Sequence, residues 1–428
     1  QLATALGGVL TAALYVLDEP SVGRHPRDVS RLLEVLYAIR NQGNTVVVVE
    51  HAPEIVAAAD HLIDLGPGAG RSGGTLVAEG SVEEIRRESA SITGRALAGE
   101  LRPRRQRRRA SGRSLRIVGA RSNNLRDLSV EIPLHQLVVV TGVSGAGKSS
   151  LVRSVLVGQL RRDPERGEFD RIEGAEQIGD VVLVDPTPPS RSLRSNPATV
   201  SKAFDGIRRQ FAATAEARRR GLAPGWFSFN VAGGRCEKCE GIGETVVDMQ
   251  FLEDLRVPCE SCGGSRYREE ARAIRLHGRS IVDVLALTIE EALVLFDGDR
   301  GIASRLRPFA RVGLGYLTLA QPLVSLSGGE LQRLRLAQAL AVGRPDSLYV
   351  LDEPTTGLHA AEIGVLLACL DELLEAGGSA VVVEHNLDLI GQSDHVIDLG
   401  PEGGPGGGRL VATGTPRQVA RVRRSHTG

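Results

Sequence analysis

The sequence predicts an α/β fold built on a parallel sheet, and three observations support that prediction. Short β-branched runs alternate with segments of helical apolar spacing, one such run leads into a glycine loop of the phosphate-binding type, and a long segment recurs. Strands buried on both faces are continuous apolar runs, and repeated strand–loop–helix order favours parallel pairing. We therefore expect related α/β domains rather than a solenoid.

The strand and helix predictions fall at matching places in the repeat. Val46–Val49 and Ala380–Val383 are β-branched runs suited to strands buried on both faces. Arg31–Arg40 and Val365–Leu374 have the apolar spacing of helices. Leu137–Thr141 is a further apolar strand that leads directly into the glycine loop.

The composition is that of a globular protein. Of 428 residues, 42% are hydrophobic and 24% charged, and 52 basic residues balance 52 acidic ones, so net charge indicates no polyanionic partner. Long apolar runs and a charged leader are missing, which predicts no membrane partner and no secretion signal. Five cysteines, four of them in CxxC pairs, indicate a reducing, cytoplasmic location.

The repeat consists of two unequal copies. LYVLDEP occurs at 14–20 and again at 348–354, and the same offset of 334 residues relates VVVEH at 47–51 to its copy at 381–385. The second copy follows a phosphate loop, whereas only 13 residues precede the first. We expect that a matching upstream part of the first domain is missing from this sequence.

The repeat and the changes of composition predict the domain boundaries. Residues 1–100 are expected to be the later part of a first domain, 101–114 a basic linker, and 115–428 a complete second domain with an insertion at about 186–320. The arginine run at 102–109 is expected to be solvated, because like charges repel. Contact with nucleic-acid phosphate is the open alternative.

A phosphate-binding loop is predicted at 142–149, where GVSGAGKS fits G-x-x-x-x-G-K-[ST] at every fixed position. Its glycines allow backbone amides to face phosphate oxygens, Lys148 would reach the β- and γ-phosphates, and Ser149 would bind Mg²⁺. A helix from Ser150 would direct its positive end at the anion. The candidate nucleotide-binding residues here are Gly142, Val143, Ser144, Gly145, Ala146, Gly147, Lys148, Ser149 and Ser150.

Candidate catalytic residues follow two further strands. The strand Ser347–Leu351 ends in Asp352, a candidate Mg²⁺ ligand, and Glu353, which would activate the attacking water. His385 follows a second strand and could reach a γ-phosphate. Lys148, Glu353 and His385 together form the predicted catalytic set. Their counterparts in the first copy are Asp18, Glu19 and His51.

A second anion-binding segment is LSGGE at 326–330, where Ser327, Gly328 and Gly329 open a helix. LSGGE followed by LYVLDEPTTGLH and then by a strand and a histidine resembles the ATP-binding cassette (ABC) family. That resemblance implies ATP as the cofactor. It also implies two cassettes that enclose two ATP molecules, each between one phosphate loop and the opposite LSGGE.

A structural zinc site is predicted from two CxxC pairs, Cys236 with Cys239 and Cys259 with Cys262, which are separated by a segment of 19 residues. This module, at 232–268, includes a predicted hairpin at 244–258. The hairpin is acidic on balance, so phosphate contacts are expected from flanking cations. These cations are Arg235, Lys238, Arg266 and Arg268.

With this cysteine insertion in an ABC-type cassette, the chain resembles the UvrA family, the damage-sensing ATPases of nucleotide excision repair. The resemblance rests on NNLRDLSVEIP, TGVSGAGKSSL, RSNPAT, FSFNVAGGRCEKC, FLEDLRVPCESCGGSRY, SLSGGELQRLRLA and both LDEP segments. It implies an ATPase that binds damaged duplex DNA by shape, and a homodimer. A UvrB-type partner stays open, because the family segment that contacts UvrB is absent.

Two departures from the family pattern keep other functions open. Pro186 stands where the family has a glutamine after Val-Asp, and Arg24 stands where the second copy has Leu358. One alternative is a UvrA-like ATPase that confers drug self-resistance. The other is a transporter ATPase, although the zinc module and the doubled cassette argue against it.

Overall fold

The computed structural model describes residues 11–68, 70, 73–185, 193–247 and 255–428. The chain divides into two compact units, Gln1–Asp185 with Val342–Gly428, and Pro186–Ala341. The first unit holds both copies of the repeat, and the second holds the cysteine module and LSGGE. In the described part of the chain, none of the helices combines the length and apolar character that crossing a bilayer requires.

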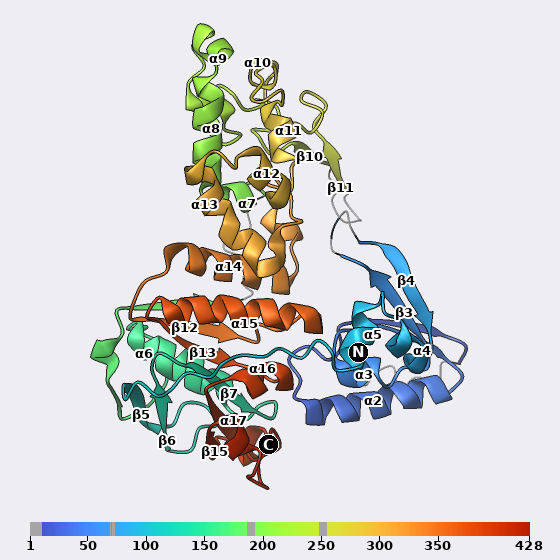
Figure 1. The fold of residues 1–428 in the computed structure, drawn as a ribbon, viewed down its shortest axis with the longest axis vertical. Coiled ribbons are helices and arrows are strands. Elements are labelled where there is room, and N and C mark those ends of the chain that lie inside the picture. Colours follow the sequence, from blue (N-terminus) through green and yellow to red (C-terminus); the bar gives the residue numbers. More distant parts are fainter. Residues whose placement is uncertain (1–10, 69, 71–72, 186–192, 248–254) are drawn as a thin grey trace. The chain divides into compact units, whose positions relative to one another are not determined.

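The second copy is built on a six-stranded sheet with the order β15-β14-β7-β13-β12-β9. Of these strands, β7, β12, β13 and β15 are labelled in Figure 1. Neighbouring strands are parallel except for the edge pair β14–β15, so the predicted parallel sheet is confirmed. A separate antiparallel sheet has the order β6-β5-β8. The strands are β5 (Ser114–Ala120), β6 (Leu128–Pro133), β7 (Leu137–Gly142), β8 (Arg171–Glu173), β9 (Asp180–Val184), β12 (Ser347–Asp352), β13 (Ser379–Val383), β14 (His395–Gly400) and β15 (Arg409–Gly414).

Helices cover this sheet, and one of them begins directly after the glycine loop. Segment η2 (Ser150–Val157) is a π-helix, which refines the helix predicted from Ser150. It buries Leu151 and Val155 against Val138 and Val140 of β7, and these side chains belong to one large apolar core. The other helical segments are α6 (Gly158–Leu160), η3 (Ala175–Gln177), α15 (Ala360–Glu375), α16 (Leu387–Gln392), η7 (Gly404–Gly406) and α17 (Pro416–Val419).

The first copy forms two small sheets, a parallel pair β1–β2 and an antiparallel pair β3–β4. Helix α2 packs Val29, Leu32 and Leu36 against one face of β1–β2. The elements are β1 (Leu14–Asp18), α2 (Pro26–Asn41), β2 (Thr45–Val49), α3 (Pro53–Val56), β3 (Leu62–Gly66), β4 (Thr75–Gly80), α4 (Val82–Arg87) and α5 (Ile92–Leu97).

One burial prediction is wrong. The run Val46–Val49 is a strand, but only one face is partly buried, and Val47 and Val49 are exposed. The matching run in the second copy, β13, is buried throughout. In that copy β7 pairs with β13, whereas β2 pairs with β1 alone among the described strands.

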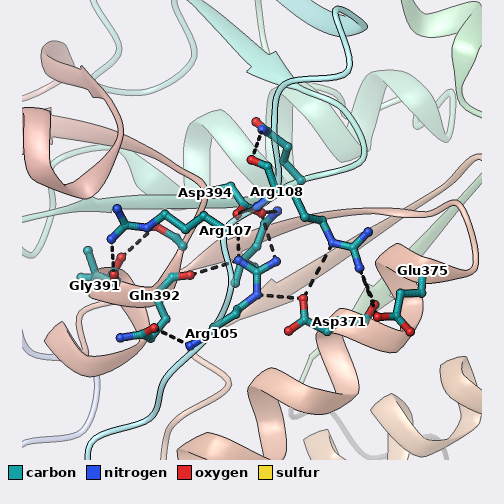
Figure 2. Close-up of polar contacts among 12 residues, drawn as sticks. Arg105, Arg107, Arg108, Asp371, Glu375, Gly391, Gln392 and Asp394 are labelled. Carbon is teal, nitrogen blue, oxygen red and sulfur yellow. Dashed lines mark hydrogen bonds and ion pairs between the residues drawn. The ribbon is translucent and has the colours of Figure 1, made fainter.

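The basic linker is held against the second copy rather than solvated throughout (Figure 2). The Arg105 side chain is 2% exposed, and it pairs with Asp394 at 2.9 Å and with Asp371 at 2.8 Å. The backbone amide of Arg108 donates to Asp394, and the Arg107 guanidinium donates to a backbone carbonyl of α16. Arg105 is therefore unavailable to nucleic-acid phosphate.

The second unit is helical around the cysteine hairpin. Strands β10 (Glu244–Val247) and β11 (Leu255–Pro258) pair antiparallel, which confirms the predicted hairpin; its acidic tip and Pro186 lie outside the described residues. The other elements are α7 (Pro197–Val200), α8 (Ala203–Ala213), α9 (Ala215–Arg219), η4 (Pro224–Phe227), α10 (Glu269–Arg272), α11 (Ile281–Leu285), α12 (Ile289–Leu295), α13 (Arg300–Phe309), η5 (Ala310–Leu314), η6 (Leu323–Ser325) and α14 (Gly328–Val342).

Candidate functional site

The glycine loop between β7 and η2 has a backbone that side chains would disrupt. Gly142 and Gly147 have φ values of 133° and 102°, in the region that favours glycine. A Cβ on Gly142 would lie 2.0 Å from the carbonyl oxygen of Leu399 on β14, and one on Gly147 would lie 2.9 Å from a methyl group of Leu125. The loop thus needs glycine both for its conformation and for its packing.

Two other segments hold the loop in place, one around Asn124 and one at Gly404 and Gly408. The carbonyl of Gly145 accepts hydrogen bonds from the Asn124 side chain at 2.8 Å and from the amide of Gly404 at 3.0 Å. The carbonyl of Ala146 accepts from the amide of Gly408 at 3.1 Å. These carbonyl contacts fix the outer side of the loop. The only sequence signal for Asn124 was its place in the motif NNLRDL.

Lys148 is a buried cation at the centre of the loop. Its Nζ donates to the carbonyls of Gly142 at 2.9 Å and Val143 at 3.0 Å. Burial lowers the pKa of the ammonium group, and the nearby carboxylates of Glu353 and Asp352 oppose that shift. A desolvated ammonium among loop glycines suits a ligand with several negative charges.

The two carboxylates at the end of β12, Asp352 and Glu353, lie in different environments. Asp352 Oδ2 lies 2.8 Å from Arg153 Nε on η2, a partner that the sequence did not suggest. Glu353 has a positive φ of 48°, and its amide donates to the carbonyl of Val383. Burial, together with the charges of Glu384 and Asp352, raises the pKa of Glu353 to about 7. Such a carboxyl group can accept a proton near neutral pH.

His385 completes this cluster. Its Nε2 lies 3.7 Å from Glu353 Oε1. Burial, with Lys148 and His25 nearby, lowers the pKa of His385 to about 2, so its imidazole is neutral and the pair is no salt bridge. Its buried Nδ1 finds no hydrogen-bond partner in the described part of the chain.

Glu384 is a structural carboxylate that the sequence analysis missed. It accepts hydrogen bonds from the amides of Thr355, His385 and Asn386, and from the Thr355 hydroxyl. It therefore joins the loop after Glu353 to the residue His385. Glu50 plays the same part in the first copy, and its presence in both VVVEH segments was the available signal.

The first copy repeats the glutamate–histidine pair. His51 Nε2 lies 3.7 Å from Glu19 Oε1, the same separation as in the second copy, and Glu19 also has a positive φ. Asp18 ends β1 as Asp352 ends β12. Each glutamate also faces a glycine of the other copy: a Cβ on Gly23 would lie 3.3 Å from Glu353 Oε2, and one on Gly357 would lie 3.5 Å from Glu19 Oε1.

LSGGE lies at the start of α14 in the second unit. The Ser327 hydroxyl accepts from the Glu330 amide at 3.2 Å, and Glu330 Oε2 accepts from the Ser327 amide at 2.7 Å. This is a reciprocal capping box. Ser327 and Gly328 are exposed, and Gly329 is half-buried. The exposed start of this helix leaves serine and glycine accessible to an anion.

The four predicted zinc ligands come together. The sulfur atoms of Cys236, Cys239, Cys259 and Cys262 all lie within 4.8 Å of one another, in a buried cluster. Cys236 and Cys259 are 4.0 Å apart, and Cys239 and Cys262 are 3.7 Å apart. Zn–S bonds of ~2.3 Å in a tetrahedron place the sulfur atoms ~3.8 Å apart. The geometry fits a structural zinc ion.

The cations flanking the zinc module are not equally accessible. Lys238 pairs with Glu260 and Arg268 with Glu237, in exposed ion pairs. Arg266 is half-buried over the ring of Phe229, with its guanidinium carbon 5.4 Å from the ring centre, and burial lowers its pKa. Exposed ion pairs are weak. The ion pairs of Lys238 and Arg268 are therefore easily exchanged for other partners.

Comparison with known proteins gives close relatives along the whole chain. UvrABC system protein A from Aquifex aeolicus is 50% identical over 438 residues, covering 100% of this chain and 47% of that protein. The protein of the same name from Thermus thermophilus is 50% identical over 430 residues, covering 98% of this chain and 45% of that protein. The chain thus spans about half the length of the curated relatives it matches.

Solved structures agree on the fold. The crystal structure of UvrA2 from Deinococcus radiodurans matches with a TM-score of 0.94 at 44% identity, over 100% of this chain and 52% of that chain. An archaeal ribosome recycling factor in complex with a ribosomal stalk protein matches in fold alone, with a TM-score of 0.51 at 17% identity, over 98% and 64%. A family model described as Novel STAND NTPase 1 matches residues 117–223, which include the glycine loop. The predicted α/β fold of ABC type with a four-cysteine module is confirmed.

Proposed function

The chain belongs to the UvrA family of ABC-type ATPases, and on that premise we propose that the protein hydrolyses ATP to recognise damaged duplex DNA in nucleotide excision repair. The observation that carries the proposal is the 50% identity to UvrABC system protein A along the whole chain. The cluster of Lys148, Glu353 and His385 would supply the chemistry that this function requires.

Each predicted nucleotide-site residue has a proposed role. The amides of Gly142–Ser150 and Lys148 would hold the phosphates of ATP, and Ser149 and Asp352 would ligate Mg²⁺. Glu353 would accept a proton from the attacking water, and His385 would contact the γ-phosphate. Bound Mg²⁺ would neutralise charge that develops on the phosphates.

The remaining predicted residues would act in a composite arrangement. Ser327, Gly328 and Gly329 would bind the ATP held by an opposite phosphate loop. Asp18, Glu19 and His51 would serve a second site. We propose 1–100, 101–114 and 115–428 as the end of a first cassette, a linker and a complete second cassette.

The proposed partner is duplex DNA, read through its shape and deformability rather than its base edges. Cys236, Cys239, Cys259 and Cys262 would hold one Zn²⁺ that shapes the module carrying Lys238 and Arg268. A homodimer and a UvrB-type partner are proposed for the full-length protein. Free thiols in the cluster suit the proposed cytoplasmic location.

The test compares duplexes with and without a bulky adduct at fixed salt, with and without ATP. We expect tighter binding to the adducted duplex and ATP hydrolysis that responds to DNA. Lys148→Ala should lose ATP binding and keep its zinc, whereas Cys236→Ser should lose zinc and lesion preference and keep ATP binding. Equal affinity for both duplexes, with resistance to a free DNA-binding drug in cells, would instead favour the drug-resistance function.

A further inference from the structure

A short motif outside the nucleotide site occurs once in each copy of the repeat. Ser-x-Thr-Gly is found at 91–94 and at 425–428, again 334 residues apart. In the first copy, Ser91 Oγ and Thr93 Oγ1 donate to the two carboxylate oxygens of Asp64 at 2.5 and 2.8 Å. Asp64 lies on β3.

The second copy repeats this arrangement. Ser425 Oγ and Thr427 Oγ1 donate to the two carboxylate oxygens of Asp398 at 2.5 and 3.3 Å. Asp398 lies on β14, at the position that corresponds to Asp64. Two hydroxyl groups on one carboxylate fix the threonine side chain in both copies.

Each threonine also contacts a histidine of the other copy. Thr427 Oγ1 lies 3.3 Å from Nε2 of His25, which caps the start of α2. Thr93 Oγ1 lies 3.3 Å from Nε2 of His359, which caps the start of α15. The two histidines correspond in the repeat, so the two contacts are reciprocal.

The helix caps determine the direction of these hydrogen bonds. Nδ1 of His25 accepts from the amide of Arg27 at 3.2 Å, and Nδ1 of His359 accepts from the amide of Ala361 at 3.3 Å. A neutral imidazole whose Nδ1 accepts carries its proton on Nε2. Each Nε2–H therefore donates to a threonine oxygen, and that threonine hydroxyl donates to its aspartate.

Neither histidine is charged in this arrangement. Burial lowers the pKa of His25 to about 4 and lowers that of His359 below its ordinary value. Protonation of Nδ1 would remove the acceptor that caps the helix. The neutral form is thus the one that supports both the cap and the contact to threonine.

The threonine–histidine contacts lie next to the loops that face the two glutamates. His25 follows the loop with Gly23, which faces Glu353, and His359 follows the loop with Gly357, which faces Glu19. Thr427 Oγ1 also lies 3.2 Å from the hydroxyl of Thr141, the residue before the phosphate loop. The contacts of Thr427 with His25 and Thr141 thus connect the phosphate loop of the second copy with the Gly23 loop of the first copy.

We propose that Thr427–His25 and Thr93–His359 are positioning contacts that hold each copy's glycine loop against the glutamate of the opposite copy. The His25 ring also lies edge-on to the ring of His385, with the ring centres 5.6 Å apart. The proposed positioning acts through Gly23 and Gly357, and at the Glu353 site also through this ring contact. This proposal rests on ATP hydrolysis at the Glu353 site as proposed above. Because Thr427–His25 serves that site, it is the pair to test.

The test uses the 428-residue chain and three variants. Thr427→Val removes the hydroxyl at nearly constant shape, and His25→Asn removes Nε2 while asparagine still suits a helix cap. We expect each to lower kcat for ATP about tenfold, the scale of one hydrogen bond, with the ATP dissociation constant unchanged. Thr427→Ser should restore the parent kcat.

Ser425→Ala is the matched control, because it removes a hydrogen bond to the same Asp398 without touching His25. It should lower the melting temperature and leave kcat unchanged. Equal kcat losses in Ser425→Ala and Thr427→Val would overturn the positioning role, since both would then reflect general stability.

A double mutant separates this proposal from the proposed function. In Thr427→Val/His25→Asn, the loss of melting temperature should be smaller than the sum of the two single losses, because both remove one contact. That measurement needs no ATP. Non-additive losses would support the contact whether or not the parent chain hydrolyses ATP, whereas the proposed function is judged by hydrolysis and DNA binding. Additive losses would overturn the contact itself.

Discussion

Strands β1–β2 of the first copy and β12–β13 of the second pair in the same parallel register, yet the same positions are exposed in one copy and buried in the other. Val47 is 45% exposed, whereas its counterpart Val381 is 1% exposed. The apolar positions that are exposed in the first copy and buried in the second are Leu14, Val16, Val47, Val49, Ile63 and Leu65. The buried counterparts are Leu348, Val350, Val381, Val383, Ile397 and Leu399.

The cause of the difference is a single central strand and its helix. In the second copy β7 lies between β13 and β14, and η2 packs on the sheet from the same segment. Among the described strands of the first copy, β2 and β3 belong to separate sheets. An apolar β-branched run thus specifies a strand, while the covering segment decides whether its second face is buried.

The largest expected effect comes from placing a charge on this face in each copy. Val381→Asp would bury a carboxylate in the main core, which should cost at least ~4 kcal/mol of unfolding free energy. Val47→Asp puts the same charge on an exposed position and should change stability by less than ~0.5 kcal/mol. Chemical denaturation of both variants measures the difference.

The outcome also reports on solution behaviour. Val47→Asp should reduce binding of a hydrophobic dye, because it interrupts an exposed apolar face. If Val47→Asp destabilised the chain as strongly as Val381→Asp, the face of the first copy would be covered in solution. That result would break the contrast between the copies.

The linker gives the next largest effect, since its arginine contacts are made with the second copy. Arg105→Ala would leave the buried Asp394 without its main cation, and should cost about 3 kcal/mol of unfolding free energy. Arg104→Ala, at an exposed neighbour, is the matched control and should cost less than ~0.5 kcal/mol. Similar melting curves for the two variants would show that the Arg105–Asp394 pair is not the anchor.

The linker also shows where sequence reasoning stops. The strands at 137–141 and 380–383, the glycine loop and the cysteine ligands could be predicted, because local pattern and spacing determine them. The burial of Arg105 could not, because its partners lie more than 260 residues away, and a run of arginines gives no sign of them.

Two features of the site could be predicted from the sequence in part or not at all. The threonine–histidine contacts had a signal in the repeated Ser-x-Thr-Gly, but pairing across copies requires the three-dimensional arrangement. The pairing of Arg153 with Asp352 had no signal, since it depends on how η2 lies against β12. Long-range geometry, rather than residue type, sets both.

The two glutamates offer a second comparison between the copies. In the 428-residue chain, Glu353→Gln should lower ATP hydrolysis about 100-fold, the lower end for removing a general base, and keep ATP binding. Glu19→Gln should change hydrolysis by less than about twofold, because the described phosphate loop belongs to Glu353's copy. Radiolabelled ATP detects both rates. Equal losses would mean that Glu19 takes part in hydrolysis at this loop.

The smallest expected effect is a pH dependence that belongs to Glu353. Burial disfavours its charged form, so its pKa is raised to about 7. As a base it must be ionised, and a group of that pKa is ~10% ionised at pH 6 and ~90% at pH 8, so hydrolysis at saturating ATP should rise about ninefold. An ordinary glutamate with a pKa of ~4.3 would give a flat profile across this range. His385, with its pKa lowered to about 2, does not titrate there.

Glu384→Gln sharpens the test, because it removes a neighbouring charge that helps to raise the pKa of Glu353. The midpoint of the profile should then move to lower pH. A midpoint that stays fixed in Glu384→Gln, or a flat profile in the parent chain, would mean that another group limits hydrolysis.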